Sequence, residues 1–147
     1  MKPFTLLRIA ALLALLQCIG HGTLFVTYVP KHGPDEVAVV DAMSTQYFSF
    51  SGHLRSYWDM YFGYGLMAVL NCLIEAVLFW QLAVIAKTSP HSVRPAAALF
   101  LLANLGYTAL VWTYFFPLPG YFDMAIAACL GLVLVTTRRG GQTSAAA

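Results

Sequence analysis

The chain has 147 residues, of which 60% are hydrophobic and only 10% are charged, and its formal net charge is +2. A soluble domain carries about 25% charged residues, so this composition excludes an ordinary soluble protein and is typical of a membrane protein. Since one span needs about 20 residues, the chain has room for four spans and for no separate soluble domain. The basic residues are few and scattered, and we expect no nucleic-acid partner.

The first predicted span covers residues 8–29, RIAALLALLQCIGHGTLFVTYV. Lys2 and Arg8 stand at its start, so a cleaved signal peptide is the alternative interpretation. The apolar run continues beyond the usual length of a signal-peptide core and ends without a small-residue cleavage pattern, which favours an uncleaved anchor. Gln17 and His21 lie four residues apart and share one face of this helix.

A polar segment, residues 30–56, separates the first two spans. Pro34, Asp35 and Glu36 are typical of a helix start, because proline suits the first turn and acidic residues favour the positive end of the helix dipole. We therefore expect a helix over residues 35–43. It would lie over the outer mouth of the bundle, within a long external loop between the first two transmembrane helices.

The second predicted span covers residues 57–86 and begins at a capping-box pattern, Ser-Tyr-Trp-Asp at 56–59. Tyr64 and Asn71 share one face at heptad spacing, and Glu75 follows Asn71 by one helical turn. A carboxylate inside a span costs about 2.5–3.5 kcal/mol or more, so it is a candidate functional residue wherever it occurs. Glu75 is therefore the first candidate in this chain.

The third and fourth predicted spans cover residues 95–116 and 121–136, and Asn104 and Tyr107 lie inside the third. The last ten residues, 138–147, are polar and rich in small side chains. This composition predicts a disordered cytoplasmic tail.

The predicted fold is all-α, a polytopic membrane protein whose four transmembrane helices pack as a bundle in a single domain, residues 1–137. Basic residues fall mostly on one side of this layout, which carries Lys2, Arg8, Lys87, Arg94, Arg138 and Arg139. The other side carries only Lys31 and Arg55. The positive-inside rule therefore predicts a multi-pass protein of the cell membrane with both termini in the cytoplasm.

Polar side chains inside the spans form the candidate site. At about 1.5 Å per residue, Glu75 and Asn104 lie about 16 and 13 Å from the inner ends of their spans, so they can meet. The candidate ligand-binding residues are Gln17, His21, Tyr64, Asn71, Glu75, Asn104 and Tyr107. The alternative interpretation is structural: these groups bond only one another and hold the bundle together.

Two function classes follow from this pattern. The first is a non-enzymatic protein that binds a lipid-like or other apolar small molecule, or serves as an accessory subunit. The alternative is a membrane enzyme for an isoprenoid- or quinone-like substrate, with Glu75 as general acid or base and His21 as the second catalytic candidate. No phosphate loop, nucleophile motif or metal-ligand spacing accompanies these residues, which favours the first class. We expect no cofactor and no metal ion, and the expected partners are the lipid bilayer, an apolar ligand, and a second copy or a membrane subunit.

Three segments carry a family resemblance: Gly-His-Gly-Thr at 20–23, His-Gly-Pro-Asp-Glu at 32–36, and RSYWDMYFGYGL at 55–66. With the four-span layout, they make the chain resemble a family of short uncharacterised bacterial inner-membrane proteins. The architecture alone is similar to that of DoxX-like membrane proteins. The resemblance covers nearly the whole chain except the tail and implies a four-helix fold in a bacterial inner membrane. It implies no activity or catalytic residues, since architecture does not define function.

Overall fold

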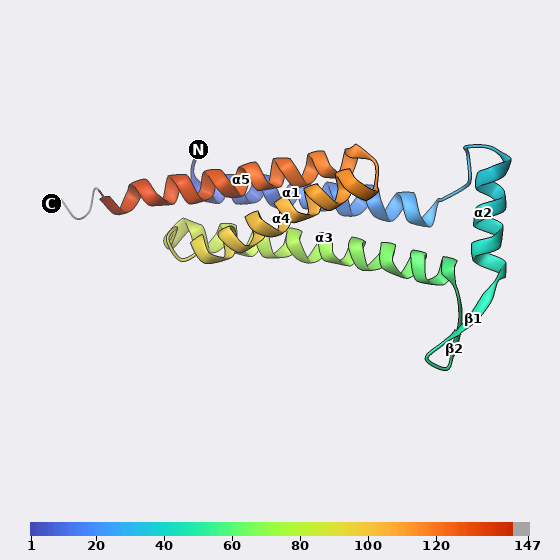
Figure 1. The fold of residues 1–147 in the computed structure, drawn as a ribbon. Helices are drawn as coiled ribbons and strands as arrows, with labels where there is room; N and C mark the ends of the chain where they lie inside the picture. Colours follow the sequence, from blue (N-terminus) through green and yellow to red (C-terminus); the bar gives the residue numbers. More distant parts are fainter. Residues whose placement is uncertain (143–147) are drawn as a thin grey trace. The chain divides into compact units, whose positions relative to one another are not determined.

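The computed structural model describes residues 1–142, with side chains through Thr137. This part of the chain is mostly helical and also holds one two-stranded hairpin (Figure 1). The elements are α1 (Pro3–Val26), α2 (Pro34–Thr45), β1 (Tyr47–Phe50), β2 (His53–Ser56), α3 (Tyr57–Thr88), α4 (Arg94–Tyr114) and α5 (Pro117–Gln142). The chain divides into two compact units, one made of Met1–Gln17 with Cys72–Ala147 and the other of Cys18–Asn71. The helices α1 and α3 each contribute residues to both units.

Four helices, α1, α3, α4 and α5, are long and apolar enough to cross a membrane. The predicted helical class and the predicted number of spans are confirmed at this level. The first helix begins at Pro3, five residues earlier than predicted, and the last begins at Pro117 rather than at 121. Both begin with proline, whose fixed φ suits the first helical position and whose missing N–H has no partner to lose there.

The end of α5 differs from the predicted disordered tail over residues 138–147. The helix continues to Gln142, so residues 138–142 are helical. No proline follows Pro119 in the sequence, so no residue of this helix-breaking type ends α5 earlier. The rest of the predicted tail, residues 143–147, lies outside the described residues.

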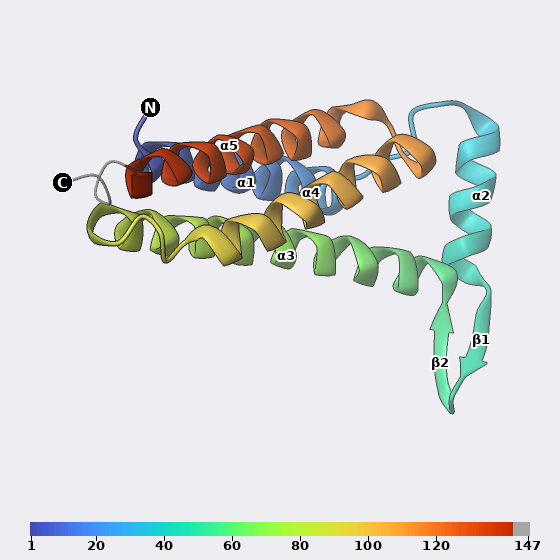
Figure 2. The ribbon, with the colours of Figure 1, turned by 60° about the vertical axis from the view of Figure 1, so that its left-hand side comes forward.

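The first unit is held together by one apolar core to which all four long helices contribute. Many of its members are alanines, and small side chains allow helices to approach closely within a membrane. The ring of Phe79 is fully buried and meets Phe100 edge to face, with the ring centroids 5.0 Å apart. Figures 1 and 2 show α4 and α5 as antiparallel neighbours joined by a short turn. The core residues are Leu6, Leu7, Ala10, Ala11, Ala14, Ala76, Phe79, Ala83, Ala86, Val93, Ala97, Ile126, Leu130 and Val133.

The second unit contains regular structure where the sequence suggests a long loop. The helix predicted over residues 35–43 is confirmed as α2, with Pro34 in its first turn. The hairpin that follows was not predicted. Its two turn residues, Ser51 and Gly52, both have positive φ, 50° and 82°, as a two-residue type I′ turn requires. Only the glycine of this pair marks such a turn in the sequence, and the preceding aromatic residues suit a membrane interface equally well.

The capping box predicted at the start of α3 is confirmed. The Ser56 amide donates to Oδ2 of Asp59 at 2.9 Å, and the Asp59 amide donates to Oγ of Ser56 at 3.0 Å. Two backbone donors that helix geometry leaves unpaired are satisfied in this way. The hairpin and the long helix are therefore joined with no linker, since β2 ends at Ser56 and α3 begins at the next residue.

Candidate functional site

Polar side chains from all four long helices lie inside the first unit. Gln17 comes from α1, Glu75 from α3, Asn104 from α4 and Asp123 from α5. Asn104 is fully buried, Glu75 is 7% exposed and Asp123 is 4% exposed. We call these four side chains the interior polar cluster. Thr108 and Thr137 are further buried polar side chains described in this unit.

Hydrogen bonds join members of this cluster across helices. Nε2 of Gln17 donates to Oδ1 of Asp123 at 3.0 Å, linking α1 to α5. The Asn104 side chain bonds the Glu75 carboxyl group, linking α4 to α3, and its Nδ2 also donates to the carbonyl oxygen of Phe100 at 3.0 Å. The cluster therefore connects the helices in two pairs.

The interior polar cluster also contains acidic and polar groups whose interactions are not completed by these hydrogen bonds. The Glu75 carboxyl group lies close enough to Asp123 for their charges to interact. Oδ1 of Asn104 is buried and has no hydrogen-bond partner within the described residues. Neither carboxyl group forms an ion pair with a basic side chain in that part of the chain. The cluster thus holds two acids and one spare acceptor, an arrangement that a shared proton or a bound water would satisfy.

The interior polar cluster contains three of the seven predicted site residues: Gln17, Glu75 and Asn104. His21, Tyr64 and Asn71 belong to the second unit, where the His21 ring contacts the Phe25 ring at a tilt of 39°, with the centroids 4.9 Å apart. Tyr107 is in the first unit but is 38% exposed. The predicted set is therefore divided between the two units.

Asp123 is the functional candidate that sequence reasoning missed. The predicted fourth span begins at residue 121, which would put Asp123 at a membrane surface. Because α5 begins at Pro117, Asp123 lies nearly two turns inside the helix and points into the core. A helix start at Pro117, the first of two closely spaced prolines, is the signal that could have revealed it.

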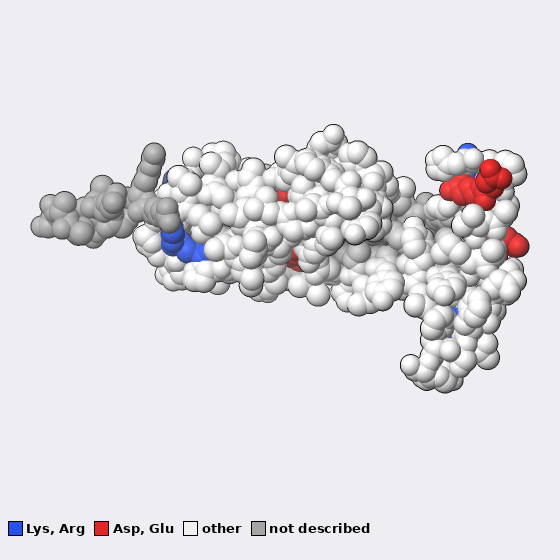
Figure 3. Space-filling view, in the orientation of Figure 1, with Lys and Arg blue, Asp and Glu red and all other residues white. Residues whose placement is uncertain are grey.

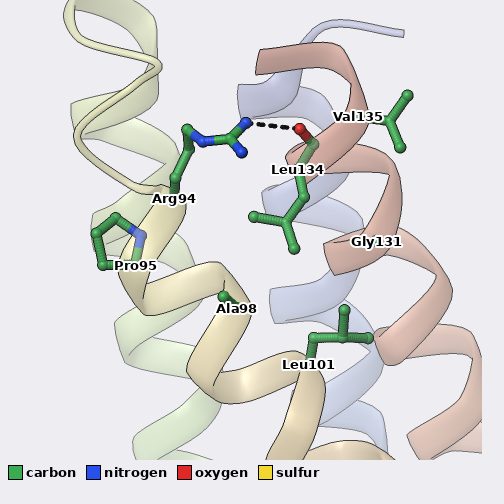
Figure 4. A pocket seen from close by; sticks show the side chains of 7 residues that line it. All are labelled: Arg94, Pro95, Ala98, Leu101, Gly131, Leu134 and Val135. Atoms are coloured by element: carbon green, nitrogen blue, oxygen red, sulfur yellow. Dashed lines mark hydrogen bonds between the residues drawn. The ribbon is translucent and has the colours of Figure 1, made fainter. Parts of the chain in front are cut away.

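A second feature of the first unit is an open groove between α4 and α5, with a volume of about 500 Å³ (Figure 4). Its walls are apolar except at one end, where the guanidinium of Arg94 lies. Nη1 of Arg94 donates to the carbonyl oxygen of Leu134 at 2.7 Å and to Oγ1 of Thr137 at 2.8 Å. The lining residues are Arg94, Pro95, Ala98, Leu101, Gly131, Leu134 and Val135. We call this feature the α4–α5 groove.

Within the described residues, no three His, Cys, Asp or Glu side chains lie close enough together to hold a metal ion. A comparison of the chain with protein-family models, curated proteins and solved structures finds no match. The resemblance to short bacterial inner-membrane proteins therefore stays a prediction.

Proposed function

We propose that this chain is a multi-pass membrane protein that binds a lipid-like molecule in the α4–α5 groove. The observation that supports this proposal is the chemistry of the groove itself. Its walls come from two helices apolar enough to span a membrane, and a single guanidinium lies at one end. An acyl or isoprenoid chain suits such walls, and an anionic headgroup suits the arginine.

The surroundings of the groove favour a lipid over a water-soluble ligand. Figure 3 shows that the visible side of α4 and α5 is almost free of charged side chains. Such a surface suits lipid tails, so a ligand would enter from the bilayer rather than from water. A second copy or another membrane subunit covering the same face is the competing occupant.

Gly131 offers a direct test, because a side chain added there points into open space within the groove. We expect Gly131→Leu to fill the groove and to reduce the lipid retained by the purified protein roughly twofold or more, since lipid contacts there rest on close packing. Native mass spectrometry from a mild detergent measures the retained lipid.

The matched control is Gly106→Leu. Gly106 lies in α4 and, like Gly131 in α5, has open space beside it, but it does not line the groove. Its lipid retention should equal that of the wild type. Equal retention in all three proteins would overturn the proposed site. A wild type that is dimeric where Gly131→Leu is monomeric would point to a second copy as the occupant.

The enzyme alternative has less support. Glu75, its proposed acid or base, is buried in the interior polar cluster and does not line the α4–α5 groove. A general acid or base must come within hydrogen-bond reach of the substrate atom it serves. The sealed position of Glu75 therefore favours binding over catalysis.

The proposed location is the inner membrane of a bacterium, with both termini in the cytoplasm and the segment between α1 and α3 outside. The asymmetry of basic residues supports it. Single cysteines at Ser44 and Ser144, in a background without the three native cysteines, test it with a membrane-impermeant thiol reagent in intact cells. Labelling at Ser44 and none at Ser144 is the expected pattern, and the reverse pattern would contradict the proposal.

A further inference from the structure

The second unit contains a groove of its own, with a volume of about 380 Å³. Its lining combines three aromatic rings, two carboxyl groups and three aliphatic or thioether side chains. The members are Tyr28, Asp35, Glu36, Val39, Val40, Met43, Trp58 and Tyr61. We call it the aromatic groove, and every residue that lines it belongs to residues 18–71.

The three aromatic rings stand side by side around Trp58. Its ring centroid lies 5.5 Å from that of Tyr28 and 5.5 Å from that of Tyr61. The planes are tilted by 41° and 39°, so the rings form a curved wall rather than a flat stack. The faces of such rings carry partial negative charge and attract cations within about 6 Å.

A fixed negative charge lies at the edge of this wall. Oε1 of Glu36 accepts a hydrogen bond from the Tyr28 hydroxyl at 2.8 Å. Oε2 accepts bonds from the backbone amides of Lys31 and His32, each at 2.6 Å, and lies 3.0 Å from Nδ1 of His32. Bonds from the His32 amide and ring, and then from the Tyr28 hydroxyl, lower the pKa of Glu36 from its usual 4.5 to about 2.

The low pKa of Glu36 keeps the carboxylate charged at physiological pH. Because the folded-state pKa lies below the unfolded value, the stabilising contribution of these bonds is complete above about 4.5. It is lost only as the pH falls toward about 2. Asp35 adds a second acid to the lining, and Figure 3 shows acidic side chains gathered beside the start of α2.

We propose that the aromatic groove binds a methylated ammonium group, either on a small free amine or on a lipid headgroup. Quaternary ammonium ions are weakly hydrated and are recognised by aromatic cages. A bare metal cation is a poorer fit, because calcium and magnesium require several oxygen ligands and most of this lining is carbon. The proposal is independent of the lipid site in the α4–α5 groove, since the two share no residue.

The test uses choline and its uncharged isostere 3,3-dimethylbutan-1-ol, each titrated into the full-length protein in maltoside micelles and followed by Trp fluorescence and calorimetry. We expect choline to bind saturably and roughly tenfold more tightly than the isostere, as one or more cation–π contacts imply. Equal affinity for the two probes would overturn the proposal, because the groove would then recognise shape alone.

Trp58→Ala should weaken choline binding by roughly tenfold or more, and Asp35→Asn should weaken it by a smaller factor. The matched control is Trp112→Ala, which removes a half-exposed tryptophan outside this groove and should leave binding unchanged. If Trp58→Ala fails to fold, Tyr28→Leu serves in its place. Equal losses in the Trp58 and Trp112 variants would contradict the assigned site.

Nanodiscs distinguish the two sources of the ligand group. Choline binding is compared in discs of phosphatidylglycerol alone and in discs that also contain phosphatidylcholine. Weaker apparent binding in the mixed discs would show that lipid headgroups occupy the groove. Equal binding in both would assign the groove to a free amine, and no binding in either would overturn the proposal.

Discussion

Phe79→Ala is expected to destabilise the four-helix unit by roughly 2–4 kcal/mol, the largest stability effect that we predict for a single substitution. Such truncations cost about 3–5 kcal/mol in soluble proteins, from lost transfer free energy and from the cavity left behind. The transfer part is smaller here, because an unfolded span stays in apolar surroundings. Phe79 is fully buried and contacts Phe100 edge to face, so its removal leaves a cavity at the centre of the core.

The measurement is thermal or denaturant unfolding of the purified protein in one fixed detergent. Phe116→Ala is the matched control, because Phe116 is the same residue type, is 50% exposed and lies between α4 and α5. We expect the control to change stability by at most about 0.5 kcal/mol. Equal effects of the two substitutions would show that the core around Phe79 does not hold the helices together.

The sequence was sufficient to predict the spanning helices, because long apolar runs have few other uses in proteins. It also predicted α2 and the capping box at Ser56, since both depend on local rules of helix starts. The hairpin between them does not follow from such local rules. Strand pairing depends on contacts between residues on different strands, and these four-residue strands show little alternation of polar and apolar side chains.

The candidate site shows the same limit of local reasoning. Depth along straight helices correctly brought Glu75 and Asn104 together, because depth needs only the rise per residue. The same reasoning left Asp123 at a surface, since an error of four residues in the helix start moves a side chain by a full turn. The partnership of Gln17 with Asp123 depends on how α1 and α5 pack, and no spacing within either helix specifies it.

Glu75→Gln and Glu75→Leu should have clearly different effects on the interior polar cluster. Glutamine keeps the shape and the hydrogen-bonding capacity of a neutral glutamic acid, so we expect the free energy of unfolding to stay within about 0.5 kcal/mol of the wild-type value. Leucine removes the group that the Asn104 side chain bonds, and an unpaired buried amide costs about 1–3 kcal/mol. Both variants are measured by unfolding in the same detergent.

The comparison rests on Glu75 being uncharged in the folded protein at pH 7. An ionised carboxylate with no paired base would be costly in this interior, and a second carboxyl group at Asp123 makes two charges less favourable still. Infrared difference spectra of wild type and Glu75→Gln test this directly, with Asp123→Asn as the control that keeps an acceptor for Gln17. A carboxylate band lost on Glu75→Gln at pH 7 would contradict the neutral assignment.

If glutamine preserves stability but abolishes a cellular phenotype, the proton on Glu75 has a function, and the enzyme alternative regains support. If glutamine is silent and leucine only lowers stability, Glu75 and Asn104 serve to hold α3 against α4.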